Sequence, residues 1–204
     1  MIAIIDYGLG NVLAFVNVYR RLNIPVLVAK TADDLINATK LILPGVGSFD
    51  HAMQQLDQSG MRPAIEQLVL RQSVPILGVC VGMQMLADSS DEGKQPGLGW
   101  IAGRVRKFDV QNMPRGTNLP HMGWNDVRPV VGGGLFKGME QDARFYFLHS
   151  YYFEPIQQSD ILASTDCGVE FSCAVRHHNI YGVQFHPEKS HHYGSLLLSN
   201  FAEF

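Results

Sequence analysis

The first half of the chain alternates between short apolar runs of strand type and longer stretches with helical spacing, and this alternation limits the possible folds more than any other feature. The strand-type and helical stretches cover, in order, residues 2–6, 12–22, 25–29, 41–45, 50–72 and 74–79. A strand that is followed by a helix and then by another strand is typical of a parallel sheet with helices on its faces. The pattern therefore predicts an α/β fold with a central, mostly parallel sheet.

The second half contains shorter strand candidates that are separated by turn-rich segments. These candidates cover residues 100–108, 124–130, 144–149, 161–165, 171–176 and 180–186. Closely spaced strands without intervening helices pair antiparallel, so we expect additional antiparallel strands here and a closing helix at roughly 191–203. No repeat, low-complexity segment or linker interrupts the sequence, and we expect one domain over residues 1–204.

Composition and charge indicate a globular protein rather than a disordered or membrane-spanning one. Of the 204 residues, 46% are hydrophobic and 17% are charged, and the formal net charge is −3 at pH 7. This balance gives no electrostatic reason to expect nucleic acid or an anionic membrane as a partner. We find neither a signal peptide nor a run of about 20 apolar residues, and the three cysteines show no disulfide spacing. We expect reduced thiols and a cytoplasmic location.

The segment "PILGVCVGMQ" places Cys80 between two glycines, Gly78 and Gly82, at the end of a predicted strand. A helix is expected to follow, from Gly82 to about Ala87. A nucleophile on a tight strand-to-helix turn needs small neighbours, and the start of a helix favours a thiolate through its unpaired N–H groups and its dipole. A free cysteine is also among the most buried residue types. The segment alone therefore leaves two interpretations open, a catalytic thiol and a packing thiol.

The segment "VQFHPEKS" predicts a strand that ends in His186, Pro187 and Glu188. In an open α/β sheet, reactive groups gather at the carboxyl ends of the strands, so His186 could activate Cys80 and Glu188 could orient the imidazole. Residues i and i+2 share one face of a strand, which is compatible with a hydrogen bond between His186 and Glu188. A surface turn with an isolated histidine and a solvated carboxylate is the alternative.

Two glycine-rich turns follow predicted strands. In "LILPGVGSF" the glycines could turn backbone N–H groups toward a ligand, as an oxyanion hole requires, and a plain Pro-Gly turn is the alternative. The segment "DYGLGN" lacks the third glycine and the acidic residue of a dinucleotide motif. We therefore expect no nucleotide, and we expect no other cofactor.

The remaining histidines and cysteines do not predict a metal site. The histidine pairs at 177–178 and 191–192 point in different directions on either a strand or a helix, and no cysteine or carboxylate lies at zinc spacing from them. We expect these histidines to be solvated or paired with neighbours. Cys167 and Cys173 are expected to be packing residues.

The cysteine elbow, the glycine-bracketed strand end and the His-x-Glu pair, in this chain order, resemble the class I (triad) glutamine amidotransferases. The segments that carry the resemblance are "IDYGLGN", "LPGVGSFDHAM", "GVCVGMQMLADSSDEG", "GLGWI", "PHMGWNDV", "FYFLHSYYFEP" and "GVQFHPEKSHHYGSLLLSNFAEF". Within that family they look like the glutaminase subunits that form a heterodimer with a (β/α)8-barrel cyclase. The resemblance implies a flavodoxin-like fold with antiparallel strands in the C-terminal half.

Matched residue by residue, the resemblance implies a Cys-His-Glu triad. Cys80 would attack the side-chain amide of glutamine, forming a thioester and releasing ammonia. His186 would transfer the protons, and Glu188 would orient His186. The backbone N–H groups of Val46 and Val81 would hold the oxyanion, after a peptide reorientation at Val46. Leucine is more usual in the family where Val81 stands, and we expect little effect because only the N–H is used.

Further matched positions concern the substrate and the partner. Those that resemble the family's grip on the amino-acid end of glutamine are Gly45, Gln84, Ser150 and Tyr151. Those that resemble its interface with the cyclase are Asn11, His121, Met122, Trp124, Tyr146 and Lys189. Ammonia would cross this interface without contact with bulk water.

The resemblance also implies an acceptor for the ammonia. The cyclase would use it to convert the nucleotide PRFAR to imidazole glycerol phosphate and AICAR, a step of histidine biosynthesis. The segments "SSDEG", "GLGWI" and "KSHHYG" also resemble paralogues that supply ammonia to a cyclase-like synthetase, which aminates or amidinates a sugar in surface-polysaccharide biosynthesis. This second acceptor remains the main alternative.

Two alternatives fall outside this chemistry: a non-catalytic member of the same fold and another cysteine hydrolase. A non-catalytic member is expected to have lost a triad residue, and Cys80, His186 and Glu188 are all present. A hydrolase of related fold would not need "PGVG", Gln84 and "HPEK" together.

Overall fold

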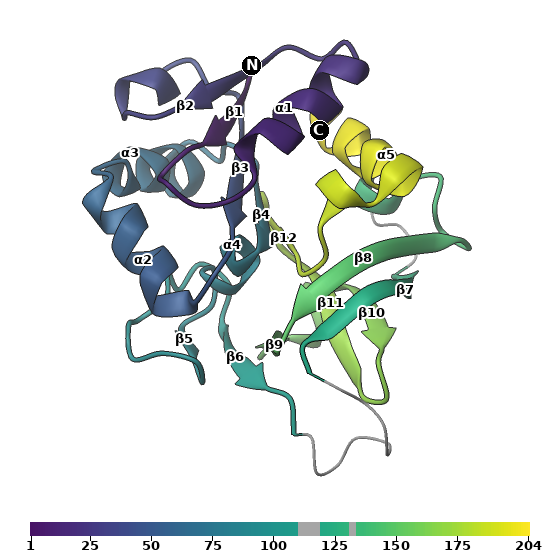
Figure 1. Ribbon diagram of the computed structural model, residues 1–204. Helices are drawn as coiled ribbons and strands as arrows, with labels where there is room; N and C mark the ends of the chain where they lie inside the picture. The colour runs from purple at the N-terminus through teal and green to yellow at the C-terminus, as the bar shows by residue number, and fades with distance from the viewer. Residues whose placement is uncertain (110–118, 131–133) are drawn as a thin grey trace.

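The computed structural model describes residues 1–109, 119–130 and 134–204. Its main sheet has nine strands in the order β2-β1-β3-β4-β12-β11-β10-β7-β8 (Figure 1). A second sheet has three strands in the order β5-β6-β9. Together with the helices described below, these sheets confirm the predicted α/β fold, with a parallel core and antiparallel strands from the C-terminal half of the chain.

One half of the main sheet is parallel. It contains β1 (Ile2–Ile5), β2 (Val26–Ala29), β3 (Lys40–Gly45), β4 (Ile76–Cys80) and β12 (Ile180–Val183), and each neighbouring pair among them runs in parallel. The side chains of β1 and β4 are buried along their whole length. Strands that are covered on both faces are expected to be continuously apolar, and this explains why the sequence shows them as unbroken apolar runs.

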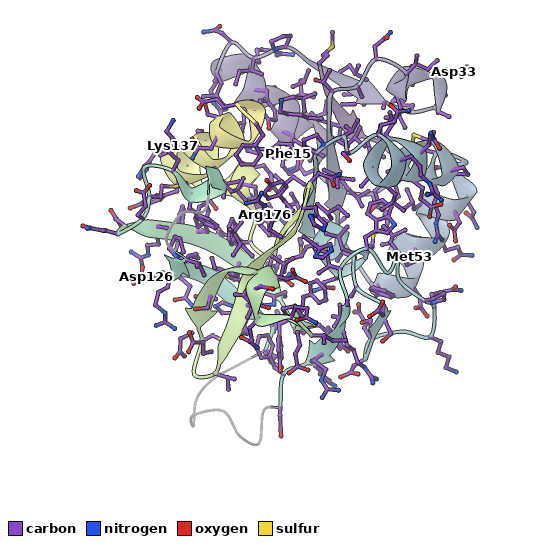
Figure 2. All side chains as sticks on the ribbon, turned by 180° about the vertical axis from the view of Figure 1, so that it is seen from behind. Phe15, Asp33, Met53, Asp126, Lys137 and Arg176 are labelled. Atoms are coloured by element: carbon purple, nitrogen blue, oxygen red, sulfur yellow. The ribbon has the colours of Figure 1, made fainter. Side chains whose placement is uncertain are left out.

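Helices cover both faces of the parallel strands. Helix α1 (Val12–Arg21) and helix α5 (His191–Ala202) lie side by side, and α2 (Phe49–Gln58) and α3 (Arg62–Glu66) lie on the opposite side of the sheet (Figure 1). Figure 2 shows Phe15 of α1 and Met53 of α2 in the interior, where both side chains are buried. None of the helices in the described part of the chain combines the length and the apolarity that a membrane crossing requires.

The predicted helix over 50–72 is interrupted. It ends at Gln58, restarts as α3 and continues as a π-helical turn over Gln67–Arg71. Gly60 has a φ of +70°, a left-handed conformation that a continuous helix cannot contain and that glycine adopts readily. The apolar spacing therefore predicts the helical faces but not this break.

The other half of the main sheet is antiparallel. It consists of β11 (Glu170–His177), β10 (Ile161–Asp166), β7 (His121–Pro129) and β8 (Ala143–His149). The second sheet is formed by β5 (Ser89–Ser90), β6 (Gly103–Lys107) and β9 (Tyr151–Pro155). Single-turn 3-10 helices lie at Asp33–Leu35, Gly134–Phe136, Gln158–Asp160 and Pro187–Lys189.

The helix after Cys80 is shorter than the sequence predicts. Helix α4 spans Val81–Gln84 only. The next three carbonyl groups, from Met85 to Ala87, accept hydrogen bonds of 2.8 to 3.0 Å from backbone N–H groups of the segment 98–100. Because these carbonyls are used by another part of the chain, the helix stops after one turn.

The topology brings the predicted reactive segments to one edge of the sheet. Strand β4 lies between β3 and β12. Gly45 is the register partner of Cys80, and Val183 is the register partner of Val79. Since all three strands are parallel, the turn after β3, the elbow after β4 and the segment after β12 emerge side by side.

Candidate active site

Cys80 occupies a strained elbow between β4 and α4. Its φ is 57° and its ψ is −115°, which is outside the regions that a side chain normally allows and costs about 1–3 kcal/mol. A Cβ atom on Gly82 would lie 2.0 Å from the carbonyl oxygen of Leu43, and one on Gly78 would lie 2.6 Å from the carbonyl oxygen of Gly82. The glycines on either side of Cys80 are therefore required because the backbone approaches itself so closely.

His186 is held against β8 by its backbone. Its N–H donates to the carbonyl oxygen of Tyr146 at 2.9 Å, and its carbonyl oxygen accepts from the Ser190 hydroxyl at 2.7 Å. The imidazole is only 4% exposed, and both it and Cys80 line the same pocket. The backbone contacts thus fix the ring position beside the elbow.

The pKa of His186 is raised to about 9. Burial alone would lower it, but hydrogen bonds with Cys80 and Glu188 and the charges of both partners outweigh burial. At neutral pH the imidazole is therefore protonated, which is the state that stabilises a thiolate on Cys80.

Glu188 supports the imidazole from behind. Its Oε1 lies 2.9 Å from Nδ1 of His186, and its side chain is only 2% exposed. Its Oε2 is buried and has no hydrogen-bond partner among the residues that the structure describes. The His-x-Glu spacing correctly predicts this contact, but the strand geometry behind the prediction is wrong. Strand β12 ends at Val183, and the 3-10 turn Pro187–Lys189 brings the carboxylate back to the ring.

The expected contribution of a helix dipole to the thiol is small. Helix α4 has only four residues, so few aligned peptide units contribute to its dipole. The imidazolium of His186 is therefore a second group, besides the N–H groups at the start of α4, that can stabilise negative charge in the pocket.

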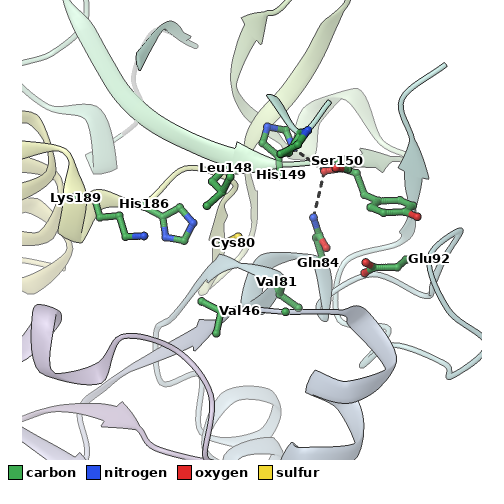
Figure 3. A pocket seen from close by; sticks show the side chains of 13 residues that line it. Val46, Cys80, Val81, Gln84, Glu92, Leu148, His149, Ser150, His186 and Lys189 are labelled. Carbon is green, nitrogen blue, oxygen red and sulfur yellow. Dashed lines mark hydrogen bonds between the residues drawn. The ribbon is translucent and has the colours of Figure 1, made fainter. Parts of the chain in front are cut away.

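The turn after β3 packs directly on the elbow. A Cβ atom on Gly45 would lie 2.3 Å from the backbone nitrogen of Gly82, so only glycine fits there. Val46 and Gly47 follow and line the same pocket as Val81, and Val46 is 39% exposed. The structure thus brings together the two predicted oxyanion positions, Val46 and Val81, next to each other in the pocket wall beside Cys80 (Figure 3).

These residues surround a pocket with a volume of about 290 Å³ (Figure 3). It is lined by Val46, Gly47, Cys80, Val81, Gln84, Glu92, Pro120, Leu148, His149, Ser150, Tyr151, His186 and Lys189. All predicted substrate residues except Gly45 line it; Gly45 lies behind the wall, against the elbow. The volume suits a small polar molecule of amino-acid size.

Glu92 is a pocket residue that the sequence did not single out. Its Oε2 accepts a hydrogen bond of 2.8 Å from the backbone N–H of Phe49, at the first turn of α2. Figure 3 shows Glu92 and Gln84 on the same side of the pocket. Its only signal in the sequence is its position in "SSDEG", where it cannot be distinguished from a solvated acid.

The side-chain amide of Gln84 has a fixed orientation. Its Nε2 donates to the carbonyl oxygen of Tyr151 at 3.2 Å and to Oε1 of Gln184 at 3.0 Å. Because both N–H groups of the Gln84 amide already donate hydrogen bonds, Oε1 of Gln84 is the atom that can accept a hydrogen bond from a ligand. Gln184, also missed from the sequence, places its own Nε2 3.8 Å from Sγ of Cys80.

The residues that the sequence predicts at the cyclase interface differ in their exposure and in their distance from the pocket. Met122 and Trp124 on β7 are 65% and 38% exposed, and Trp124 packs edge-on against Tyr146 of β8. Lys189 is exposed at the pocket, and Asn11 is exposed at the start of α1, away from the pocket lining. His121 instead places its ring toward His149, beneath the hairpin surface.

The other two cysteines are distant from this chemistry. Cys173 is fully buried on β11, and burial raises the pKa of its thiol. Cys167 is half-buried, and its pKa is also raised by burial. Within the described ranges, no group of three or more histidine, cysteine or acidic side chains could hold a metal ion.

A parallel α/β sheet that carries a cysteine elbow and a His–Glu pair at its carboxyl edge defines a class I glutamine amidotransferase. The family model described as "Glutamine amidotransferase class-I" matches residues 3–203. A solved structure described as a glutamine amidotransferase superposes with a TM-score of 0.76 at 20% identity, covering 99% of this chain and 97% of that one. At this identity, the superposition supports the fold.

Relatives of similar sequence show to which family within the class I glutamine amidotransferases the chain belongs. The chain is 64% identical to "Imidazole glycerol phosphate synthase subunit HisH" of Bdellovibrio bacteriovorus, over 100% of both chains. It is 50% identical to the protein of the same name in Leptospira borgpetersenii, over 99% of both chains. The chain belongs to the class I glutamine amidotransferases and, within them, to the HisH family of imidazole glycerol phosphate synthase subunits.

The raised pKa of His186 gives the first prediction. In Cys80→Ala the sulfur is removed and burial is opposed only by Glu188, so the pKa of His186 should fall well below 9. Histidine titration by NMR on both proteins measures this difference. An unchanged pKa in Cys80→Ala would show that the imidazole is not paired with the thiol.

Proposed function

We propose that the chain is the glutaminase of a two-subunit imidazole glycerol phosphate synthase in histidine biosynthesis. The observation that carries the proposal is the pair Cys80 and His186 in the lining of one pocket, with the Glu188 carboxylate behind the imidazole, in a chain with HisH relatives along its full length. The protein acts as a single cytoplasmic domain and uses no cofactor.

Catalysis begins with a nucleophilic attack. The Cys80 thiolate adds to the side-chain carbonyl carbon of glutamine, and the backbone N–H groups of Val46 and Val81 hold the oxyanion. The His186 imidazolium gives its proton to the departing nitrogen, which leaves as ammonia and a glutamyl thioester remains. His186, then neutral and oriented by Glu188, takes a proton from water, which attacks the thioester and releases glutamate.

The pocket suits the zwitterionic end of glutamine. The Glu92 carboxylate and Oε1 of Gln84 are two acceptors on one side, and together they match an α-ammonium group. Ser150 and Tyr151 line the same end. His186 and Cys80 occupy the opposite end, so the substrate's amide is directed to the thiol.

The released ammonia passes to a (β/α)8-barrel cyclase that binds over the pocket mouth. Three exposed apolar side chains support this placement: Met122, Trp124 and Leu148, which are 65%, 38% and 37% exposed. They lie on the adjacent strands β7 and β8, and Leu148 lines the pocket. Exposed aromatic and methionine side chains beside a pocket are typical of interface cores.

The acceptor assignment can be tested with the reconstituted pair. Cys80→Ser should lose glutamine-dependent formation of imidazole glycerol phosphate from PRFAR but keep formation from added ammonium salt, because only the thiol is changed. Product is measured by chromatography with each nitrogen source. Glutamine-dependent synthesis by Cys80→Ser would remove Cys80 as the nucleophile. No synthesis from PRFAR by the wild-type pair with either source would favour a sugar acceptor.

The proposed cyclase-binding surface, which contains Met122, Trp124 and Leu148, can be tested by replacing two of these exposed apolar side chains. Met122→Asp combined with Trp124→Ala should weaken cyclase binding by at least about tenfold, since central aromatic contacts contribute about 2 kcal/mol or more. Ile36→Asp is the matched control, because Ile36 is 72% exposed but lies beside β2, at the opposite edge of the sheet from β8. Calorimetric titration measures the affinity for the cyclase of the double variant and of Ile36→Asp. Equal affinity in the double variant and the control contradicts this docking surface.

A further inference from the structure

Two histidines face each other across the β7–β8 hairpin, next to the pocket. His121 and His149 are direct register partners, and Nδ1 of His121 lies 2.9 Å from Nε2 of His149. His149 is buried and lines the pocket, and its Nδ1 lies 2.7 Å from the carbonyl oxygen of Tyr151. The proposed reaction steps use neither ring.

The neighbours of these rings fix their protonation. A carbonyl oxygen only accepts, so Nδ1 of His149 carries a hydrogen and donates it to Tyr151. Burial lowers the pKa of His149 to about 3 although this hydrogen bond acts in the opposite direction, so the ring is neutral. Its Nε2 then accepts from Nδ1–H of His121. Nε2 of His121 lies 3.3 Å from the amide nitrogen of Asn125, which donates to it.

From His149 the hydrogen bonds continue to the catalytic sulfur. The Tyr151 carbonyl accepts from both His149 and Nε2 of Gln84, at 2.7 and 3.2 Å. Gln84 also donates to Gln184, whose own amide lies 3.8 Å from Sγ of Cys80. Each of these donors and acceptors lies within hydrogen-bonding distance of its neighbour, so the position of the Tyr151 carbonyl limits the orientation of the Gln84 amide.

We propose that His149 is a positioning residue for glutamine binding: its Nδ1–H holds the Tyr151 carbonyl where Gln84 must donate to it, so that Oε1 of Gln84 faces the substrate. His121 holds His149 in the required tautomer. This inference rests on the proposed glutaminase function and adds a specific role to two residues outside the triad. Without the Nδ1–H, the Tyr151 carbonyl loses its anchor, and Gln184 is then the one fixed acceptor among the two that orient the Gln84 amide. An amide that turns over would present its N–H groups to the substrate's α-ammonium, which is repulsive.

Two substitutions separate the two nitrogen atoms of His149. An asparagine amide nitrogen can occupy the place of Nδ1, so His149→Asn keeps the donor to Tyr151. A glutamine amide reaches the place of Nε2, so His149→Gln keeps an acceptor for His121 and loses the donor to Tyr151. His177→Gln is the matched control, because His177 lies on β11 and pairs with Asp160, outside the pocket lining.

The experiment measures KM for glutamine and kcat of the glutaminase reaction in the assembled pair with the cyclase, together with thermal unfolding of each variant. His149→Gln should raise KM about five- to tenfold, the ratio for one lost hydrogen bond, with a smaller change in kcat. His149→Asn should raise KM less than His149→Gln does, because it keeps the donor to Tyr151, and His177→Gln should stay within about twofold of the wild type.

Two results would overturn the inference. One is an unchanged KM in His149→Gln while the wild type hydrolyses glutamine. The other is an equal loss of activity and of thermal stability in His149→Asn and His149→Gln, which indicates a purely structural ring. A wild-type pair that hydrolyses no glutamine contradicts the proposed function itself, so the two failures are distinguishable.

Discussion

The active site depends on the close approach of two backbone segments, the end of β3 and the turn after β4. A Cβ atom on Gly82 would lie 2.0 Å from the Leu43 carbonyl oxygen, and one on Gly45 would lie 2.3 Å from the Gly82 nitrogen. This contact holds Cys80 in its strained positive-φ conformation, which persists only when the surroundings determine it. It also places the turn after β3, which we propose as part of the oxyanion hole, against the cysteine elbow. A side chain at either glycine would separate the nucleophile from the groups that assist it.

Two histidines of the same pocket have opposite pKa shifts, and the difference comes from their partners. Both are buried, and burial lowers the pKa of each. Interactions of His186 with the Cys80 thiol and the Glu188 carboxylate outweigh burial and raise its pKa to about 9. Among the described residues, His149 hydrogen-bonds to a carbonyl and to another histidine, so burial dominates and lowers its pKa to about 3. One ring can therefore carry a proton for catalysis, while the other is a neutral hydrogen-bonding group.

The sequence predicts the parallel sheet and the reactive turns because both depend on local features: apolar runs, glycines and a His-x-Glu pair. The sequence does not predict the features that depend on contacts between residues far apart in the chain. The helix after Cys80 ends early because the segment 98–100 uses its carbonyls. The contact between His121 and His149 joins two strands and has no local signal in the sequence, and the contact of His121 with the cyclase stays a prediction. Glu92 and Gln184 reach the site through folding alone, since nothing near them in the sequence distinguishes them from surface or core residues.

The central claim is that Cys80 is the nucleophile of a glutamine-specific pocket, and covalent labelling tests it most directly. The protein is treated with a glutamine analogue that carries an electrophile at the amide position, and the modified peptide is identified by mass spectrometry, with and without excess glutamine. We expect one label per chain, on Cys80, and protection by glutamine. Labelling that glutamine does not reduce, or that falls on Cys167 instead, would contradict the account.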